Sequence, residues 1–250
     1  MAGSQTPVIE IRQLSTLDEF RTAVDLQKTI WGFDDLDLLP LRFFVVASRV
    51  GGQVLGGYDG ERMVAFCLGI PGIKPGNLAY IHSHMMGVLA EYRNTGVGRR
   101  LKLRQREDAL ARGIQLIEWT FDPLELKNAF FNIERLGAIV RRYAINQYGI
   151  TGSPLHGGLP TDRCYAEWWI DSPRVRSILA GEPREVQTAE RIVFPTDIAR
   201  IRSENNHLAR KIQEENSARF RDAFGRGLAV TGFAHDAAEA AYLLEPWKES

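Results

Sequence analysis

The stretch from Ala79 to Gly113 constrains the fold of this chain more than any other. It begins with an apolar, partly alternating run, Ala79 to Leu89, which is long enough for one strand. A polar segment with two glycines follows from Ala90 to Arg100. The next run has helical spacing and ends at a glycine, with an expected apolar face of Leu101, Leu103, Ala109 and Leu110. The sequence therefore predicts a strand, a glycine-containing loop and a helix in direct succession.

The loop ends where the helix is expected to begin, which is a favourable place for a phosphate group. The first N–H groups of a helix lack partners within the helix, and this end of the helix carries positive partial charge. Gly96 and Gly98 leave room for a ligand to approach the main chain closely. Arg93, Arg99 and Arg100 add positive charge nearby. A pyrophosphate suits this site.

The spacing of the loop residues separates it from two common phosphate-binding motifs. No Gly-Lys-Ser/Thr follows, so the loop is not a Walker A motif, and Leu101 stands where the dinucleotide-binding fingerprint has its third glycine. The loop does contain Arg-x-x-Gly-x-Gly from Arg93 to Gly98, after a strand that ends in Gly87-Val88-Leu89. This combination resembles the acyl-CoA-binding loop of the GNAT superfamily of N-acetyltransferases, and the superfamily resemblance extends over residues 8–170.

The resemblance implies a fold, a cofactor and a set of binding residues. In the superfamily the loop amides hold the pyrophosphate of CoA, and the backbone of the preceding strand pairs with the pantetheine arm. The expected cofactor is acetyl-CoA or another acyl-CoA. The cofactor-binding residues that this implies are Met86, Gly87, Val88, Arg93, Asn94, Thr95, Gly96, Val97, Gly98 and Arg99. Within the superfamily, the chain looks nearest to a poorly characterised bacterial group of predicted acetyltransferases, from residues 119–143, 159–163 and 230–233.

The remaining patterns predict the elements around this core. Before the central strand we expect a strand at residues 8–14 and then a helix that is capped by Ser15 or Thr16 and ends at Trp31. Residues 41–50 are expected to form a helix or a strand. A hairpin of strands 53–58 and 62–70 follows, and then a loop at 71–77. After the central helix we expect a strand at 115–121, a helix at 122–137, strands at 138–145 and 163–170, and a tail with strands at 190–194, 227–233 and 240–244 around a long helix at 196–224.

This order indicates an α/β protein with the GNAT fold, in which helices flank a mixed, mostly antiparallel central sheet. The composition changes near Ser172, where a polar segment that contains proline begins. We therefore expect an acyl-CoA-binding acyltransferase domain at residues 1–171 and a small α+β extension at 172–250. An extension of this size does not readily fold alone, so we expect it to dock on the first domain.

Acyl transfer from a thioester to an amine requires a base for the amine and stabilisation of the thiolate. His82 and His84 face one side of the same expected strand, and His84 is the favoured general base because it lies closer to the loop. A structural histidine is the alternative, and a metal is not expected because no third ligand is placed nearby. Asp162 or Arg163 could meet a charged group of the substrate, although a structural salt bridge explains either residue better.

The expected general acid departs from the superfamily pattern. The resemblance implies an Asn and, seven residues later, a Tyr in the helix after the next strand, but Leu126 and Ile133 occupy these positions. Asn128 and Asn132, four residues apart on one helix face, are expected to contact the cofactor instead. Tyr143 and Tyr148 are the candidate replacement acids, of which Tyr143 is chosen, and aromatic packing is the default explanation for each of them.

Charge and cysteine content narrow the function classes. Thirty-one basic residues balance thirty-one acidic ones in 250 residues, so neither nucleic acid nor a membrane surface is an expected partner. Cys67 and Cys164 lie in apolar runs and read as buried free thiols. The sequence shows neither a span-length apolar run nor a signal-peptide core, so we expect a cytoplasmic protein.

The function expected from the sequence is transfer of an acyl group, acetyl first, from acyl-CoA to the primary amine of a small molecule. Transfer to a protein or peptide amine, and transfer from succinyl-CoA to an amino acid, are the competing enzyme functions. A non-catalytic module that binds acyl-CoA is the alternative of a different class, because Ile133 replaces the expected Tyr. The sequence leaves open whether the protein forms a homodimer.

Overall fold

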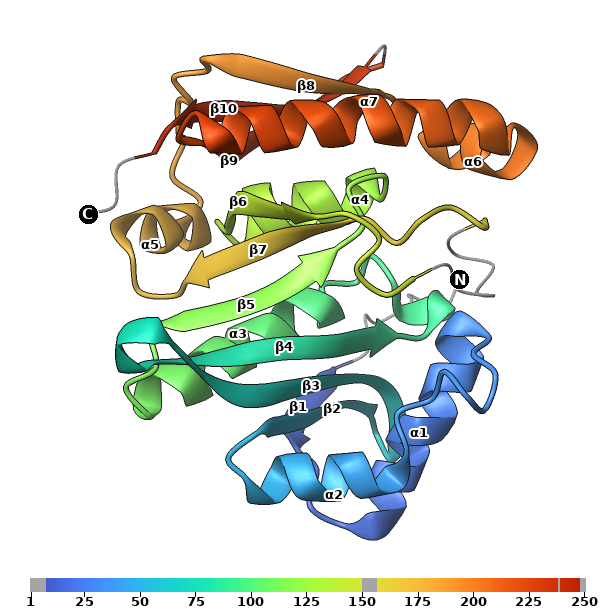
Figure 1. Cartoon of the computed structure of the whole chain (residues 1–250). Helices are drawn as coiled ribbons and strands as arrows, with labels where there is room; N and C mark the ends of the chain where they lie inside the picture. The colour runs from blue at the N-terminus through green and yellow to red at the C-terminus, as the bar shows by residue number, and fades with distance from the viewer. Residues whose placement is uncertain (1–7, 150–156, 238, 248–250) are drawn as a thin grey trace, which may run out of the picture. The chain divides into compact units, whose positions relative to one another are not determined.

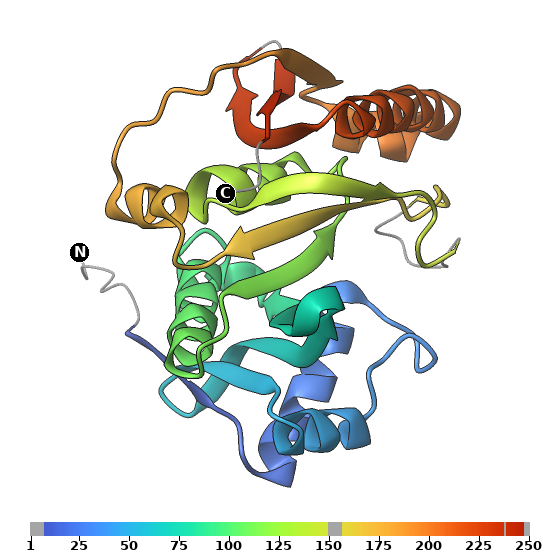
Figure 2. The ribbon, with the colours of Figure 1, turned by 60° about the vertical axis from the view of Figure 1, so that its left-hand side comes forward.

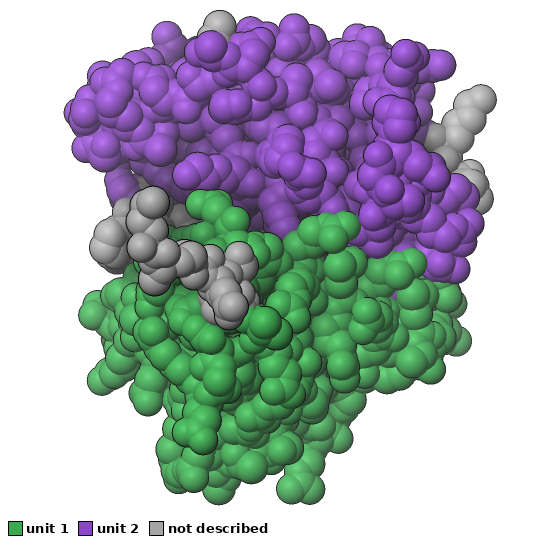
Figure 3. All heavy atoms as spheres, turned by 180° about the vertical axis from the view of Figure 1, so that it is seen from behind, with its two compact units in different colours: residues 1–117 green, residues 118–250 purple. Residues whose placement is uncertain are grey.

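The structure of the chain, a computed structural model, describes residues 8–149, 157–237 and 239–247 (Figure 1). The chain forms two compact units, residues 1–117 and 118–250, which Figure 3 colours separately. The first unit contains β1 (Ile9–Gln13), α1 (Leu17–Trp31), α2 (Leu41–Arg49), β2 (Gln53–Asp59), β3 (Arg62–Lys74), the 3-10 turn η1 (Pro75–Asn77), β4 (Leu78–Val88), the 3-10 turn η2 (Ala90–Tyr92) and α3 (Val97–Ala111).

The strand β5 (Leu116–Phe121) follows α3 and leads into the second unit. The elements after it are α4 (Leu126–Phe130), the π-helical turn η3 (Phe131–Arg135), β6 (Ile139–Ala144), β7 (Arg163–Trp169), α5 (Pro173–Ala180), β8 (Glu190–Pro195), α6 (Ile198–Glu204), α7 (Asn206–Gly225), β9 (Leu228–His235) and β10 (Glu239–Pro246). Among the described residues, no helix is both long and apolar enough to cross a membrane.

The first unit is built on an antiparallel sheet in the order β1-β2-β3-β4. Phe66 of β3 packs against rings of α1 and α2, with its centroid 5.8 Å from Trp31 and 6.2 Å from Phe44. The next residue, Cys67, lies 3.8 Å from the hydroxyl of Ser83, which is hydrogen-bonded to α3. Because consecutive strand residues point to opposite faces, α1 and α2 cover one face of this sheet and α3 covers the other (Figure 1).

The strand β4 contains a β-bulge at His84. In the pairing with β3, Ser83 lies opposite Gly69 and Met85 lies opposite Leu68, so His84 is an extra residue without a partner. A bulge of this kind bends the strand and re-aims the side chains beyond it. The plain alternation expected for this strand is therefore interrupted at one position.

The bulge reverses which residues of β4 face which helices. Before it, Ser83 faces α3, and the His84 ring lies 6.2 Å from that of Phe43 on α2. After it, the side chain of Met86 reaches the first turn of α3, whereas Gly87 faces α1. Odd-numbered residues thus point to α3 on one side of the bulge and to α1 on the other.

Several predictions for the first unit are confirmed by the structure. The side chain of Thr16 caps α1 by accepting the N–H of Glu19, whose carboxylate in turn accepts the N–H of Thr16. The ambiguous segment at 41–50 is the helix α2. The hairpin of β2 and β3 forms around Gly60, which has a φ of 57°. Both cysteines are free and buried, as expected.

Two predictions for the first unit are wrong. Pro71 to Lys74 extend β3 and pair with β4, so only residues 75–77 turn. Proline is tolerated there because the first residue of β2, Gln53, lies opposite Gly69. The part of β3 after Gly69 therefore pairs with β4 but not with β2. The helix α3 starts at Val97, inside the predicted loop. Leu101 and Ala109 lie on its buried face as predicted, but Lys102 and Gln105 are buried there in place of Leu103 and Leu110.

The second unit contains strands in the order β5-β7-β6-β9-β10-β8. The tail strand β9 pairs antiparallel with β6, where Val230 lies opposite Val140, and β10 joins β9 to β8. The helix α7 packs against these strands, with the Phe220 ring 5.4 Å from Tyr143 and 5.1 Å from Tyr242 (Figure 2). The tail elements β9, β10 and α7 therefore share a core with β6.

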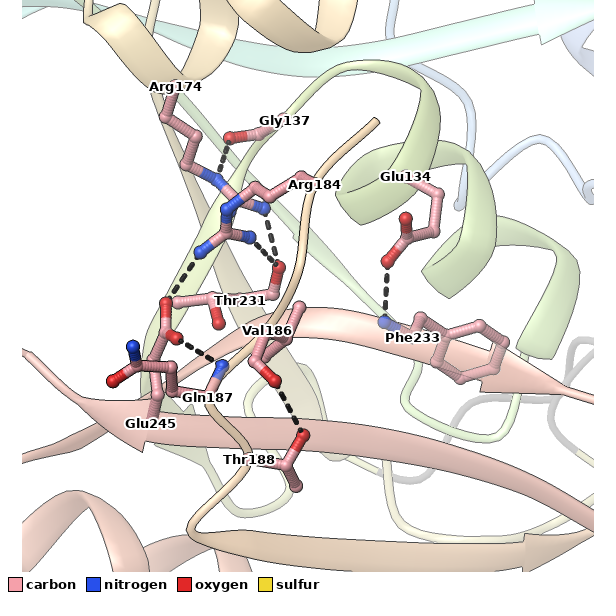
Figure 4. Close-up of polar contacts among 10 residues, drawn as sticks. All are labelled: Glu134, Gly137, Arg174, Arg184, Val186, Gln187, Thr188, Thr231, Phe233 and Glu245. Carbon is pink, nitrogen blue, oxygen red and sulfur yellow. Dashed lines mark hydrogen bonds and ion pairs between the residues drawn. The ribbon is translucent and has the colours of Figure 1, made fainter. Parts of the chain in front are cut away.

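Polar contacts also tie the tail to the segment around α4 (Figure 4). Arg174 donates to the carbonyl of Gly137 at 2.9 Å and to that of Thr231 at 2.7 Å, and Arg184 donates to the same Thr231 carbonyl at 2.8 Å. Glu134 of the π turn accepts a backbone N–H of β9 at 2.6 Å. Since partly buried hydrogen bonds to charged groups are among the stronger ones, these contacts hold β9 against the end of the π turn.

The structure corrects two predictions for the second unit and adds one helix that was not predicted. The helix expected from 122 starts only at Leu126, because the Asp122 carboxylate accepts the N–H of Leu124 in a turn, and it continues as a π turn to Arg135. The segment after Ser172 is the helix α5, which Ser172 caps. The long tail helix is two helices, α6 and α7, separated at Asn205, whose side chain caps α7.

Candidate functional site

The end of β4, the loop at residues 89–96 and the first turn of α3 converge in the first unit. The chain turns twice in left-handed backbone conformation, at Asn94 with a φ of 63° and at Gly96 with a φ of 87°. Asparagine and glycine are the residues that adopt this conformation most readily. The side chain of Thr95 closes the turn by donating to the carbonyl of Tyr92 at 2.6 Å. These turns direct the chain into α3 at Val97.

Among the described residues, the N-terminus of α3 lacks both a side-chain cap and an acidic residue in its first turn. The first N–H groups of a helix cannot bond within the helix, and the guanidinium of Arg93 lies close by, donating through Nε to the carbonyl of Val88 at 3.3 Å. This arrangement can bind an anion through main-chain amides and nearby positive charge.

The rest of the first unit fixes the loop in place. The side chain of Val97 is buried under β2, and the N–H of Leu89 donates to the carbonyl of Val64 at 2.9 Å. The hydroxyl of Tyr92 donates to Asp59 at 2.6 Å, on the β2–β3 hairpin. The chain is therefore attached to β2 and β3 both before and after Gly96.

The three glycines of the predicted site have different reasons to be glycine. A Cβ at Gly87 would lie 2.7 to 3.0 Å from atoms of α1 and β3, so packing excludes a side chain there. Gly96 needs its left-handed backbone. A Cβ at Gly98 would meet only Met86 and Val88 at 3.5 to 4.0 Å, which is ordinary van der Waals contact. The packing around Gly98 therefore leaves room for a Cβ, unlike the packing around Gly87.

His84 lies at the bulge on the face of the sheet that α2 covers. Its ring centroid is 5.8 Å from that of His82, so the structure brings the two histidines together as predicted from their spacing. The His84 residue is exposed at the surface, and desolvation by the protein atoms beside it lowers its pKa below the usual value. The neutral imidazole, which is the form that can accept a proton, is therefore favoured near pH 7. Among the described residues, no three His, Cys, Asp or Glu side chains are grouped as they would be around a metal ion.

The predicted residues of the second unit have mostly structural contacts. Asn128 on α4 is exposed, whereas Asn132 in the π turn is buried, so the shared helix face expected for them is not formed. The Tyr143 hydroxyl donates to Asp162 at 2.8 Å, and burial first, then the nearby Cys164 and Asp162, raise the pKa of Tyr143. These are the contacts of a packed, hydrogen-bonded tyrosine.

Asp162 and Arg163, which were considered as substrate contacts, are held within the second unit. The Asp162 carboxylate accepts the N–H of Asn146 as well as the hydroxyl of Tyr143, and its side chain is buried. The guanidinium of Arg163 lies 5.4 Å from the ring centroid of Tyr148. The structural interpretation of Asp162 is therefore the better one.

One group of residues near the loop was missed by sequence reasoning. Lys102 and Gln105 on α3 are buried and bonded to Ser83 on β4. The only signal in the sequence is that positions 102, 105 and 109 share one helix face. Lysine and glutamine at such positions read as a solvated surface until the strand opposite them is known to carry a serine.

No protein-family model matches the sequence, and no curated protein matches it significantly. Solved structures do match. The ribosomal-protein alanine N-acetyltransferase of Escherichia coli aligns with a TM-score of 0.52 at 16% identity, over 66% of this chain and 96% of that one. The Salmonella typhimurium protein yncA, solved with its cofactor acetyl-CoA, aligns with a TM-score of 0.52 at 15% identity, over 66% and 95%.

An aminoglycoside 6'-acetyltransferase of type Ii gives a similar result, with a TM-score of 0.51 at 16% identity over 65% of this chain and 98% of that one. At these identities the likeness concerns the fold. The chain thus has the fold of the GNAT acetyltransferases, with a mostly antiparallel central sheet flanked by helices. Each of these matches spans nearly the whole length of the other protein and about two thirds of this chain.

Proposed function

We propose that the chain is an acyl-CoA-dependent N-acyltransferase that transfers an acetyl group directly to a primary amine of a small molecule. The observation that carries this proposal is the uncapped, acid-free N-terminus of α3, which follows two left-handed turns and has an open glycine at position 98. Such a terminus suits a pyrophosphate. The GNAT fold supports the same cofactor, since one matched structure contains acetyl-CoA.

In this proposal the main-chain amides of Val97 and Gly98 would hold the pyrophosphate of CoA, and Arg93 would add positive charge. The backbone of β4 around Met86 to Val88 would pair with the pantetheine arm. Acetyl-CoA supplies an activated thioester, and no covalent intermediate with the protein is needed. His84 is the proposed general base for the amine, since it lies two residues from this strand segment and its lowered pKa favours the neutral form.

Three other functions are alternatives to this proposal. The matched proteins include an enzyme named for a ribosomal protein and one named for aminoglycosides, so the fold is compatible with a protein or a small-molecule acceptor. Transfer from succinyl-CoA to an amino acid is a further alternative. A non-catalytic acyl-CoA-binding module is favoured by one observation: Ile133 and Leu126, at the positions of the expected acid and its Asn, are buried apolar side chains.

A thermal-shift experiment tests cofactor binding. A ligand that binds only the native state at about 100 times its dissociation constant adds about 2.7 kcal/mol, which raises the melting temperature of a chain of this size by about 5–10 °C. We expect this shift with acetyl-CoA and CoA. ATP and a nicotinamide dinucleotide serve as controls. Equal shifts with all four ligands, or none with either CoA species, would contradict the proposal.

A pair of variants separates the catalytic assignment from the structural one. We expect His84→Gln to lower turnover of acetyl-CoA with an amine acceptor by about 100-fold, because general base catalysis contributes about 100- to 10,000-fold, while CoA affinity is unchanged. We expect Tyr143→Phe to lower the free energy of unfolding by about 1–3 kcal/mol, because buried Asp162 loses a donor. Steady-state kinetics and urea denaturation measure the two effects. The opposite pattern would assign the chemistry to Tyr143.

A further inference from the structure

A buried lysine connects the helix of the proposed CoA loop to the bulged strand. Lys102 lies on α3 and is 3% exposed, and its ammonium donates to the hydroxyl of Ser83 on β4 at 2.7 Å. The Ser83 hydroxyl donates in turn to the side-chain oxygen of Gln105 at 2.9 Å. Ser83 therefore uses its hydroxyl as acceptor and donor towards two residues of α3, and the Cys67 thiol of β3 lies 3.8 Å from the same oxygen.

The polar cluster continues away from the strand. Gln53 of β2 donates to the carbonyl of Gln105 at 2.8 Å and to the Asp108 carboxylate at 2.7 Å. Burying a lysine costs free energy, and the buried side-chain atoms Gln53 Oε1 and Gln105 Nε2 have no hydrogen-bond partner. Replacing buried ionic groups with well-packed apolar residues is often neutral or stabilising. A gain in stability therefore does not explain why a lysine is buried at position 102.

The position of Ser83 suggests what the lysine does. Ser83 is the last residue of β4 that faces α3 before the bulge at His84. A strand that slips by one residue presents every side chain to the opposite face. If the bulge lay after Gly87, then Gly87 would face α3 and Met86 would face α1. The space on the α1 side of Gly87 is too small for a side chain. The location of the bulge thus decides how residues 84–88 are presented.

We propose that Lys102 is a positioning residue, which fixes the bulge of β4 at His84 by holding Ser83 against α3. The ring of Phe43 on α2 contacts His84 from the other face, so the two residues of the bulge are held from opposite sides. The same helix that carries the proposed pyrophosphate site would then also set the strand that carries the proposed base. In this respect the inference rests on the proposed function.

The test uses the double variant Lys102→Met/Ser83→Ala in the full chain. Replacing both partners of the Lys102–Ser83 bond by apolar groups can be nearly neutral for stability, but the buried oxygen of Gln105 also loses its Ser83 donor. We therefore expect a folded protein whose melting temperature is lowered by several degrees. Amide hydrogen exchange of the ligand-free protein is the primary measurement. We expect exchange at residues 82–88 to rise by about tenfold, because the bulge loses its fixed position, with little change in α1. Arg104→Met, at an exposed position of the same helix, is the matched control.

Kinetics and CoA binding provide the second measurement. We expect the double variant to retain its thermal shift with CoA and to lose about tenfold in kcat, because the loop is intact and the base is misplaced. Unchanged exchange at residues 82–88 would overturn the inference, as would an equal rise throughout the first unit. If wild-type protein does not bind CoA, the proposed function fails, whereas the exchange measurement still decides the role of Lys102. Should the double variant not fold, Ser83→Ala alone is measured in the same way.

Discussion

Gly98→Glu is expected to reduce CoA affinity by about 100-fold or more while the protein stays folded. The fold accepts a side chain at this position, since a Cβ would make only ordinary contacts with Met86 and Val88. A carboxylate in the first turn also interacts favourably with the helix dipole. The same carboxylate would occupy the proposed phosphate site and repel the pyrophosphate, which removes several hydrogen bonds to a charged group, each worth about 1.5–3 kcal/mol.

Calorimetric titration with CoA and thermal denaturation together measure this effect. Gly98→Ala is the matched control: it adds the Cβ without the charge, and we expect a smaller loss of affinity. Gly96 is unsuitable as a control because its φ of 87° makes any side chain strained. An unchanged dissociation constant for Gly98→Glu in a folded protein would rule out the loop as the pyrophosphate site.

The second large effect concerns stability and pH. Burial lowers the pKa of Lys102 from 10.5 to about 8, and the neighbouring Cys67 thiol opposes this shift. Between these two values the unfolded chain binds a proton that the native protein does not. Stability rises with pH wherever the unfolded state binds more protons. Lys102 therefore adds to the free energy of unfolding as the pH rises from about 8 towards 10.5, by about 3 kcal/mol in total.

Comparison with Lys102→Met isolates this contribution. Groups such as Tyr58, whose pKa burial raises to about 12, and Cys67, whose pKa burial also raises, lower stability at high pH in both proteins. The difference between the variant and the wild type cancels the contribution of Tyr58. The contribution of Cys67 does not cancel, because Lys102 lowers the pKa of this thiol in the wild type, and its loss in the variant acts in the same direction as the expected trend. We expect the variant to be the more stable protein at pH 7 and to lose this advantage by pH 10, as measured by urea denaturation at a series of pH values. A difference that does not depend on pH would mean that Lys102 keeps an ordinary pKa.

Local signals predicted those parts of the fold that depend on neighbouring residues. The capping box of Thr16 and Glu19 started α1 where expected, because both residues satisfy the same helix terminus. The cap of α5 carried the same kind of signal, with Ser172 before a proline and Gly181 at the end, and it was overlooked in a polar segment. The glycine-containing loop before α3 was also predicted, and the left-handed turns at Asn94 and Gly96 lie within it.

Sequence patterns were insufficient where the residue that a side chain contacts lies far away in the sequence. The buried face of α3 was wrong because Lys102 and Gln105 are polar, and only Ser83 on β4 makes their burial acceptable. The shared face of Asn128 and Asn132 was wrong because a π turn intervenes after α4. The hydroxyl of Tyr143 donates to Asp162 in the second unit, a contact that the sequence did not predict, and the role of Tyr143 as an acid stays a prediction.

The sequence by itself determined the succession of strand, glycine loop and helix, and with it the place of the proposed anion site, because backbone preference and helix polarity are local properties. The tertiary structure alone decided the bulge at His84, which depends on the register between β4 and β3. It also decided that Lys102 is buried, since burial is a property of the whole packed unit and not of a residue type.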